Sequence, residues 1–226
     1  MLTLAIDCSA RFCSVALYQG GENRVVAEAS PEIGRGHAEQ LPAILQTVLD
    51  DAGVTLSQVE RLGVTIGPGS FAGIRVGVAF VRGLALANAV PVVGVGSLEA
   101  IAIPAARAKT APVMAVLDAR RDRVWALIAG ADGQITSSAA EWTPDEAAVE
   151  AARTGVWLLG SGAALLAAED ASLASRVIGD SSAPAIADVA RLASHLDPRS
   201  NPPEPRYLRD ADAKPQTGFA LPHEVV

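Results

Sequence analysis

The sequence predicts an α/β fold built from two similar halves, and three observations lead to this prediction. Of the 226 residues, 50% are hydrophobic and only 4% are aromatic, a composition that suits helices packed closely on sheets better than an aromatic-rich sandwich. Short strand-like runs are interspersed with longer segments of helical periodicity. A unit of strand, Asp, turn and strand occurs near residue 7 and again near residue 118.

The first three expected strands follow one another without an intervening helix. Residues 2–6 form a short apolar run that ends at Asp7, and residues 12–18 resume with alternating apolar positions before a Gly-Gly turn. Residues 23–29 add a third strand, after which a proline and two glycines break the pattern. The three strands are therefore expected to form a meander.

Two helices and two strands are expected to complete this half. Apolar residues between 41 and 52 have the spacing of one helical face, and Gly53 supplies a left-handed C-cap. Ser57 and Glu60 have the form of a capping box that opens a brief helical turn. The remaining expected elements are a strand at 62–66, a long helix from the 67–73 turn to about Ala89, and a strand at 90–95.

This order is the plan of one half of an actin-like or hexokinase-like domain, and the unit at Asp118 predicts the other half. We expect strands at 113–117, 124–129, 156–159 and 176–178, with a helix that starts at Pro144 and an Ala-rich helix that ends at Ala174. The predicted fold is a duplicated actin-like ATPase fold (ASKHA, ribonuclease H-like) with an abbreviated second half. Its expected parts are a first subdomain at 1–106, a second at 107–184, a helix at 185–196 that packs back on the first, and a proline-rich tail at 197–226.

Charge and cysteine content restrict the partners and the compartment. The formal net charge of −7 argues against gripping RNA without a basic partner, because phosphate binding needs Lys and Arg. The two cysteines do not indicate a set of structural disulfides, and no leader is expected at the N-terminus. We therefore expect a cytoplasmic protein. The apolar stretch from Phe71 to Val95 is interrupted by two arginines, an asparagine and a proline, which favours a buried helix over a membrane span.

Two turns have the position of a phosphate site. An Asp after the first strand of an actin-like half normally faces Mg²⁺ and ATP phosphates, yet neither turn here contains a glycine. The 67–70 loop opens a helix N-terminus that could hold an anion, but it lacks a Walker lysine. Two interpretations remain open: purely structural turns, or a residual phosphate contact. The second would use Asp7, Ser9, Gly67, Gly69, Ser70 and Asp118.

No catalytic or metal-binding residue is predicted. His37, His195 and His223 are far apart in sequence and lie on dissimilar elements. Several serines lie in turns, but no His and acid visibly pair with them, so a peptidase has little support.

The helix at 74–87 predicts a partner. Its charged residues, Arg75 and Arg82, lie on one stripe, and glycines at 69, 73 and 77 repeat every fourth residue, as if to let another backbone approach. Burial under the chain's own helices accounts for part of this apolar surface. We expect the rest to form a subunit interface together with the helix at 39–51. The residues assigned to it are Glu39, Leu45, Val48, Gly69, Gly73, Arg75, Gly77, Val78 and Arg82.

Eight segments in order along nearly the whole chain resemble the TsaB (formerly YeaZ) family. They lie at 4–9, 13–17, 37–42, 67–77, 83–87, 94–100, 117–121 and 207–210, and Gly-Pro-Gly-Ser-Phe at 67–71 is the most specific. The resemblance implies a non-catalytic scaffold that supports the transferase TsaD as it attaches threonylcarbamoyl to adenosine 37 of tRNA (t6A). It also implies that the ATPase TsaE joins, that the two helices pack on the partner or on a second copy, and that tRNA is contacted only through the complex.

The sequence also departs from the family pattern. Cys8 and Ala72 stand where Thr is common, and Ala38 where Ser is common, which weakens any nucleotide site. No second histidine accompanies His37, so the metal-dependent transfer of the catalytic relative is not expected. We expect no tightly bound cofactor, although a nucleotide at the subunit interface stays open. The alternative function is a small actin-like ATPase or kinase that uses Asp7 and Asp118 around Mg-ATP.

Overall fold

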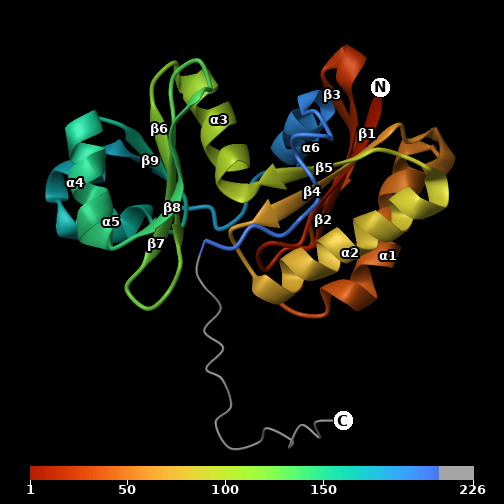
Figure 1. Cartoon of the computed structure of the whole chain (residues 1–226), viewed down its shortest axis with the longest axis horizontal. Coiled ribbons are helices and arrows are strands. Elements are labelled where there is room, and N and C mark those ends of the chain that lie inside the picture. Colours follow the sequence, from red (N-terminus) through yellow and green to blue (C-terminus); the bar gives the residue numbers. More distant parts are fainter. Residues whose placement is uncertain (209–226) are drawn as a thin grey trace, which may run out of the picture.

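The computed structural model describes residues 1–208 and contains two five-stranded sheets side by side (Figure 1). The elements of the first half are β1 (Leu2–Asp7), β2 (Ser14–Gln19), β3 (Arg24–Ala29), α1 (His37–Ala52), β4 (Arg61–Gly67), α2 (Phe71–Asn88) and β5 (Val92–Gly96). Then come α3 (Ser97–Lys109), β6 (Val113–Asp118), β7 (Val124–Ala129), β8 (Ile135–Trp142), α4 (Pro144–Thr154), β9 (Trp157–Leu159), α5 (Ala163–Glu169), β10 (Val177–Gly179) and α6 (Ile186–His195). Short 3₁₀ helices occupy Gly20–Glu22, Leu56–Gln58 and Ala171–Arg176.

The two sheets have the same topology. The strand order is β3-β2-β1-β4-β5 in one and β8-β7-β6-β9-β10 in the other. In each sheet the first three strands are antiparallel neighbours, and the last two run parallel to the first. The chain therefore has the predicted duplicated actin-like fold. Its second half is abbreviated, because β9 and β10 have three residues each.

Helices cover both faces of each sheet (Figure 1). α1 and α2 pack on the outer face of the first sheet, and α4 and α5 on the outer face of the second. α6 and α3 cover the inner faces and contact each other. Along β1 the side chains alternate accordingly, since Leu4 and Ile6 join the core under α1 and α2 while Ala5 packs beneath α6.

One arginine fixes the return of α6 to the first sheet. Arg61 of β4 donates from Nη1 to the carbonyls of Ala193, Ser194 and Leu196, at 3.0, 3.2 and 2.7 Å. These carbonyls lie at the C-terminus of α6, where helical partners are lacking and a cation is favoured. Gly63 lies directly under this helix, because a Cβ there would overlap with that of Ala193.

Several local predictions were incomplete or wrong. β8 and α3 were not predicted, and the Ala-rich helix ends at Glu169 rather than Ala174. The capping box is formed by Thr55 and Gln58, because the carboxylate of Glu60 instead accepts the N–H of Leu2 at 2.6 Å. The expected boundary at 106–107 falls inside α3. Since α3 packs on β6 and β7, we propose that the second subdomain begins at Ser97.

The end of the described chain, residues 201–208, forms a strap across the first half. The N–H of Gly94 donates to the carbonyl of Asn201 at 2.9 Å, and the N–H of Arg206 donates to the carbonyl of Ile66 at 2.7 Å. Arg206 also forms an ion pair with Glu99 at the start of α3. Of the singled-out segment 207–210, Arg209 and Asp210 lie outside the described residues, as does the rest of the tail.

Candidate ligand cleft and partner surface

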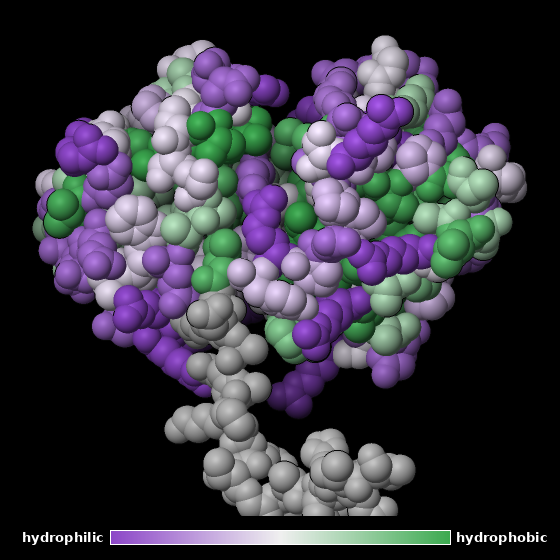
Figure 2. Space-filling view, viewed as in Figure 1, coloured by the Kyte–Doolittle hydropathy of each residue, from purple (hydrophilic) through white to green (hydrophobic). Residues whose placement is uncertain are grey.

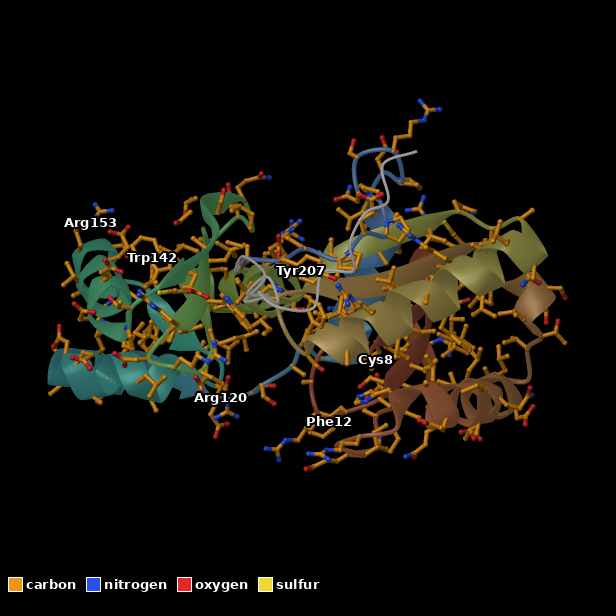
Figure 3. The ribbon with its side chains drawn as sticks, turned by 60° about the horizontal axis from the view of Figure 1, so that its bottom comes forward. Cys8, Phe12, Arg120, Trp142, Arg153 and Tyr207 are labelled. Carbon is orange, nitrogen blue, oxygen red and sulfur yellow. The ribbon has the colours of Figure 1, made fainter. Side chains whose placement is uncertain are left out.

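A cavity of about 780 Å³ lies between the two halves. The loop that follows β1 and the turn before α2 line one side, and the β6–β7 turn with Ser161 and residues 180–182 lines the other. Figure 3 shows Phe12 and Arg120, one from each half, near each other at this site. Four of the residues considered for a phosphate contact line the cavity, namely Ser9, Gly69, Ser70 and Asp118. Asp7 and Gly67 do not line it.

Asp7 is sealed inside the first half. Its side chain is 0% exposed, and Oδ1 accepts the N–H of Ser9 at 2.8 Å and the hydroxyl of Thr65 at 2.5 Å. Oδ2 has no hydrogen-bond partner among residues 1–208. Burial raises the pKa of this carboxyl above its ordinary value of 3.8, against the opposing effect of the hydrogen bonds. This enclosed position favours the structural interpretation of Asp7 over a contact with Mg-ATP.

The N-terminus of α2 is already occupied by the chain itself. The N–H of Ser70 donates to the carbonyl of Ser9 at 2.6 Å, and the Ser70 Oγ accepts the N–H of Gly73 at 3.2 Å. A Cβ at Gly69 would overlap with the carbonyl oxygen of Ser9, and a Cβ at Gly73 with that of Cys8. The glycines thus admit the turn after β1, and that turn and the Ser70 hydroxyl already accept the N–H groups of Ser70 and Gly73.

On the other side of the cavity, Asp118 is tied to its own turn. Its carboxylate accepts the N–H of Arg120 at 2.8 Å and pairs with the Arg120 guanidinium at 3.2 Å, while its own N–H donates to Ser161 Oγ at 3.1 Å. Arg120, Arg121 and Asp122 have φ of 64°, 54° and 57°, in the left-handed region that costs L-residues about 1–2 kcal/mol each. A Mg-ATP site built on Asp7 and Asp118 finds no support in these contacts.

The other chemically interesting residues support the hairpin. The Nε2 of His37 lies 3.1 Å from the carbonyls of both Ala10 and Phe12, so this ring nitrogen holds the turn. Cys8 and Cys13 are buried free thiols. A hydrogen bond from Cys13 and burial raise the pKa of Cys8. Within residues 1–208 no group of three or more His, Cys, Asp or Glu side chains is placed to hold a metal.

The predicted partner surface needs correction at six positions. Leu45, Val48 and Val78 are buried in the core of the first half. Gly69, Gly73 and Gly77 face inward, with Gly77 beside Val64 and Cys8. The backbone that approaches the glycine strip is therefore the chain's own and not a partner's. Glu39, Arg75 and Arg82 are exposed, and for them the interface stays a prediction.

The surface of α2 that does face outward was missed. Phe71 is 54% exposed and Leu86 is 87% exposed. With Arg75, Ala79 and Arg82 they fall at i, i+4, i+8, i+11 and i+15, which is one helical stripe. We call these five residues the α2 stripe; small exposed residues flank it at Ala72, Gly83 and Ala87. A helical projection of the sequence would have revealed the stripe.

The exposure of α2 is unusual for so apolar a helix. By length and composition alone it could cross a membrane, and only 28% of its residues are buried inside the molecule. A further hollow at its C-terminal end is lined by Arg82, Ala85, Leu86, Ala89, Val90 and Pro91. In the space-filling view, hydrophobic and charged residues adjoin over the half that carries this helix (Figure 2). The expectation that the helix is buried was therefore only partly right.

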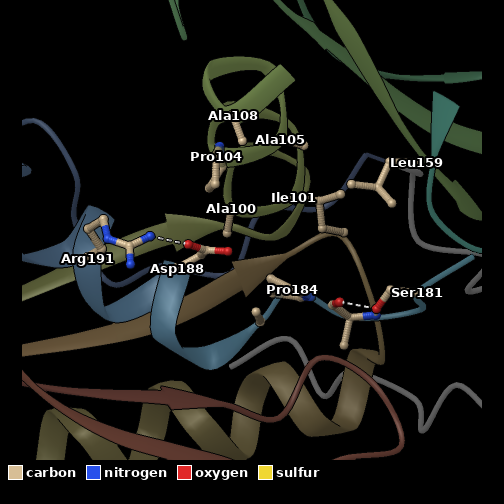
Figure 4. A pocket seen from close by; sticks show the side chains of 12 residues that line it. Ala100, Ile101, Pro104, Ala105, Ala108, Leu159, Ser181, Pro184, Asp188 and Arg191 are labelled. Atoms are coloured by element: carbon tan, nitrogen blue, oxygen red, sulfur yellow. Dashed lines mark hydrogen bonds and ion pairs between the residues drawn. The ribbon is translucent and has the colours of Figure 1, made fainter. Parts of the chain in front are cut away.

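A second cavity of about 450 Å³ lies between α3 and α6 (Figure 4). Most of its lining is alanine, proline and isoleucine, contributed by α3 and by residues 183–185 just before α6. At one end Arg191 pairs with Asp188 at 2.5 Å, and burial raises the pKa of Asp188. The pair satisfies the charges within the chain, so this cavity shows no reactive group.

Comparisons with known proteins find two related kinds of tRNA threonylcarbamoyladenosine protein. The family model described as "TsaD: tRNA N6-adenosine threonylcarbamoyltransferase" matches residues 28–158. The Escherichia coli K12 protein named "tRNA threonylcarbamoyladenosine biosynthesis protein TsaB" is 38% identical over 126 residues, which are 55% of this chain and 53% of that protein. The chain thus spans about half the length of the curated relatives it matches. A tRNA N6-adenosine threonylcarbamoyltransferase from Sphingopyxis alaskensis is 41% identical over 38% of this chain and 25% of its own.

A solved structure extends the match to nearly the full length. The Pseudomonas aeruginosa protein described as having "similarity to peptidase YEAZ" superposes with a TM-score of 0.76 at 31% identity, over 92% of this chain and 99% of that one. The likeness therefore covers both halves of the fold.

Proposed function

This chain belongs to the TsaB (YeaZ) family, within the wider group that the TsaD model describes, and from that premise we propose that it is a non-catalytic subunit of the t6A machinery. In this role it binds and supports a TsaD-type transferase that places threonylcarbamoyl on adenosine 37 of tRNA. We place it in the cytoplasm, where tRNA is modified.

The observation that carries the proposal is the α2 stripe. Full burial of such a side chain contributes about 1.5–3 kcal/mol, and Phe71, 54% exposed, and Leu86, 87% exposed, forgo part of it, which a docked partner would recover. The cleft favours the same conclusion, because the buried carboxyl of Asp7 and the paired carboxylate of Asp118 do not fit Mg-ATP chemistry by this chain alone.

The test is binding to the TsaD-type transferase of the same organism. Leu86→Glu places a charge on the stripe, and Val149→Glu does the same on α4, where Val149 is 69% exposed. We expect Leu86→Glu to weaken the complex at least tenfold in titration calorimetry and to lower t6A formed in a reconstituted reaction, measured by mass spectrometry of digested tRNA. Val149→Glu should leave both unchanged. Equal behaviour of the two variants would contradict the proposed surface.

Three finer assignments belong to the same proposal. A TsaE-type ATPase joins the assembly, and without a partner the chain pairs with a second copy through α1 and α2. A nucleotide that takes part would bind where the partner covers the cleft, which Ser9 and Ser70 line from the first half and Arg120 from the second. Calorimetry with Mg-ATP should then give no heat with the chain alone and binding with the complex. Turnover by the chain alone would favour an ATPase.

A further inference from the structure

Arg75 lies between two aromatic side chains at the start of α2. Its guanidinium carbon is 3.6 Å from the centre of the Phe71 ring and 5.6 Å from the centre of the Tyr207 ring. Its Nε–H donates a hydrogen bond of 2.8 Å to the Tyr207 hydroxyl. Figure 3 shows Tyr207 beside the first turns of α2. These contacts hold an exposed guanidinium in one orientation.

Tyr207 is itself held in place by the strap. The preceding residue, Arg206, is fixed by its backbone bond to Ile66 and its ion pair with Glu99, and the following residue, Leu208, packs on the core under α3. The tyrosine therefore lies between two anchored neighbours. The tail motif, which the proposed function leaves without a role, thus places its aromatic ring on Arg75.

Arg75 lacks a carboxylate partner among residues 1–208, whereas its neighbour on the stripe, Arg82, pairs with Glu204 at 3.7 Å. The contact with Tyr207 uses Nε, and the contact with Phe71 uses the face of the guanidinium. The two Nη groups have no hydrogen-bond acceptor in the described part of the chain. The edge that binds a carboxylate through two parallel hydrogen bonds is therefore available.

Resting on the proposed function, we propose that Arg75, Phe71 and Tyr207 form a preorganised socket for a carboxylate of the partner, namely an Asp or Glu side chain on a helix that docks on the α2 stripe. Arg and Tyr are the residue types that dominate binding energy at interfaces. A guanidinium already fixed by stacking loses less entropy when it binds. The small residues Ala72, Ala79 and Gly83 let such a helix come close.

The charge pattern of α2 favours a different protein over a second copy that packs α2 against α2. α2 contains no Asp or Glu, so two copies that pack α2 against α2 would place no acid opposite Arg75. A partner helix that carries an acid at this level would satisfy the guanidinium.

The experiment measures the affinity of the full-length chain for the TsaD-type transferase by calorimetry, with Arg75→Gln, Arg75→Lys and Tyr207→Phe. We expect at least a tenfold loss of affinity for Arg75→Gln. For Arg75→Lys we expect about a threefold loss of affinity, because Lys keeps the charge but cannot form two parallel hydrogen bonds to a carboxylate. Tyr207→Phe keeps the ring and loses the hydroxyl, so about a threefold loss is expected. Arg153→Gln, an exposed arginine of α4, is the control and should bind as the parent chain does.

The outcomes separate this proposal from the one on which it rests. If Arg75→Gln binds like the parent chain while Leu86→Glu no longer binds, the socket is overturned and the partner surface stands. If the parent chain does not bind the transferase, the proposed function fails first. If light scattering shows that Arg75→Gln changes only self-association, the occupant is a second copy and the assignment to an acidic partner helix is wrong.

Discussion

At the scale of single residues, Asp7 illustrates how a catalytic position becomes a structural one. The carboxyl lies at the end of β1, where an actin-like half usually presents it to a ligand, but here Thr65 and the turn after β1 enclose it. Oδ1 accepts two hydrogen bonds, whereas Oδ2 has no hydrogen-bond partner within residues 1–208. Such a group contributes to stability in a way that depends on pH.

The sign of that dependence follows from the raised pKa of Asp7 in the folded state. Because the folded pKa lies above the unfolded value of 3.8, protonation favours the folded state. This contribution is complete below the unfolded pKa and is lost as the pH rises through the folded pKa, at about 1.4 kcal/mol per unit of difference between the two.

Asp7→Asn should remove this loss, because the amide keeps an acceptor at Oδ1 and does not titrate. We therefore expect Asp7→Asn to become more stable relative to the parent chain as the pH rises from 4 to 7, so that its free energy of unfolding minus that of the parent chain increases. Urea unfolding at several pH values measures the difference. Parallel curves for the two proteins would show that Asp7 does not titrate as inferred.

Predictions about the position of single residues agreed with the structure where a strand or helix fixed that position. They differed from it where a turn or a contact with a distant strand did. Ser70 and Asp118, both considered for a phosphate contact because of their places after a strand, line the cavity. The enclosure of Asp7 depends on Thr65 of another strand, and the pairing of Asp118 with Arg120 depends on three left-handed residues in a row. Neither a long-range hydrogen bond nor an unusual backbone conformation leaves a periodic signal in the sequence.

At the scale of the elements, α2 contains glycines that are needed for close packing and one glycine that is not. A Cβ at Gly73 would overlap with the carbonyl of Cys8, whereas a Cβ at Gly83 would meet nothing within 4 Å. Gly83→Ala should therefore stabilise the chain by about 1 kcal/mol through helix propensity. Gly73→Ala should destabilise it by about 2–3 kcal/mol, because the turn after β1 must move.

Thermal unfolding of these two variants gives a matched comparison within one helix. The expected changes in midpoint have opposite signs. A stabilised Gly73→Ala would mean that the turn after β1 does not press on α2, and the glycine strip would again be available to a partner.

The elements themselves were largely predictable, and the exceptions have physical reasons. The first half was read correctly because its strands and helices are long and periodic and are separated by glycine or proline. β8 was missed because it is an edge strand whose polar residues, such as Ser137 and Ser138, show no alternation. α3 was missed because it follows β5 without a break and contains Pro104, which suggests a helix end.

At the scale of the whole molecule, the two similar halves enclose a cleft whose arginines are already paired with carboxylates of the chain. Two arginines line the cavity, and each is already paired, Arg11 with Glu32 at 3.0 Å and Arg120 with Asp118 at 3.2 Å. The chain as a whole carries a formal net charge of −7. Neither the cleft nor the total charge favours a polyanion.

The chain alone should therefore bind tRNA poorly, and the partner should supply the contact. Affinity for nucleic acid arises mainly when Lys and Arg release counterions from phosphates, and arginines that are paired with carboxylates release few. We expect no anisotropy change for labelled tRNA below about 10 μM chain at 150 mM salt, a range in which nonspecific binders already respond. The complex with the transferase should bind more tightly, with an affinity that falls steeply as salt rises. Tight, salt-dependent binding by the chain alone would show that its exposed arginines contact phosphate directly, and the assignment of tRNA recognition to the partner would then be wrong.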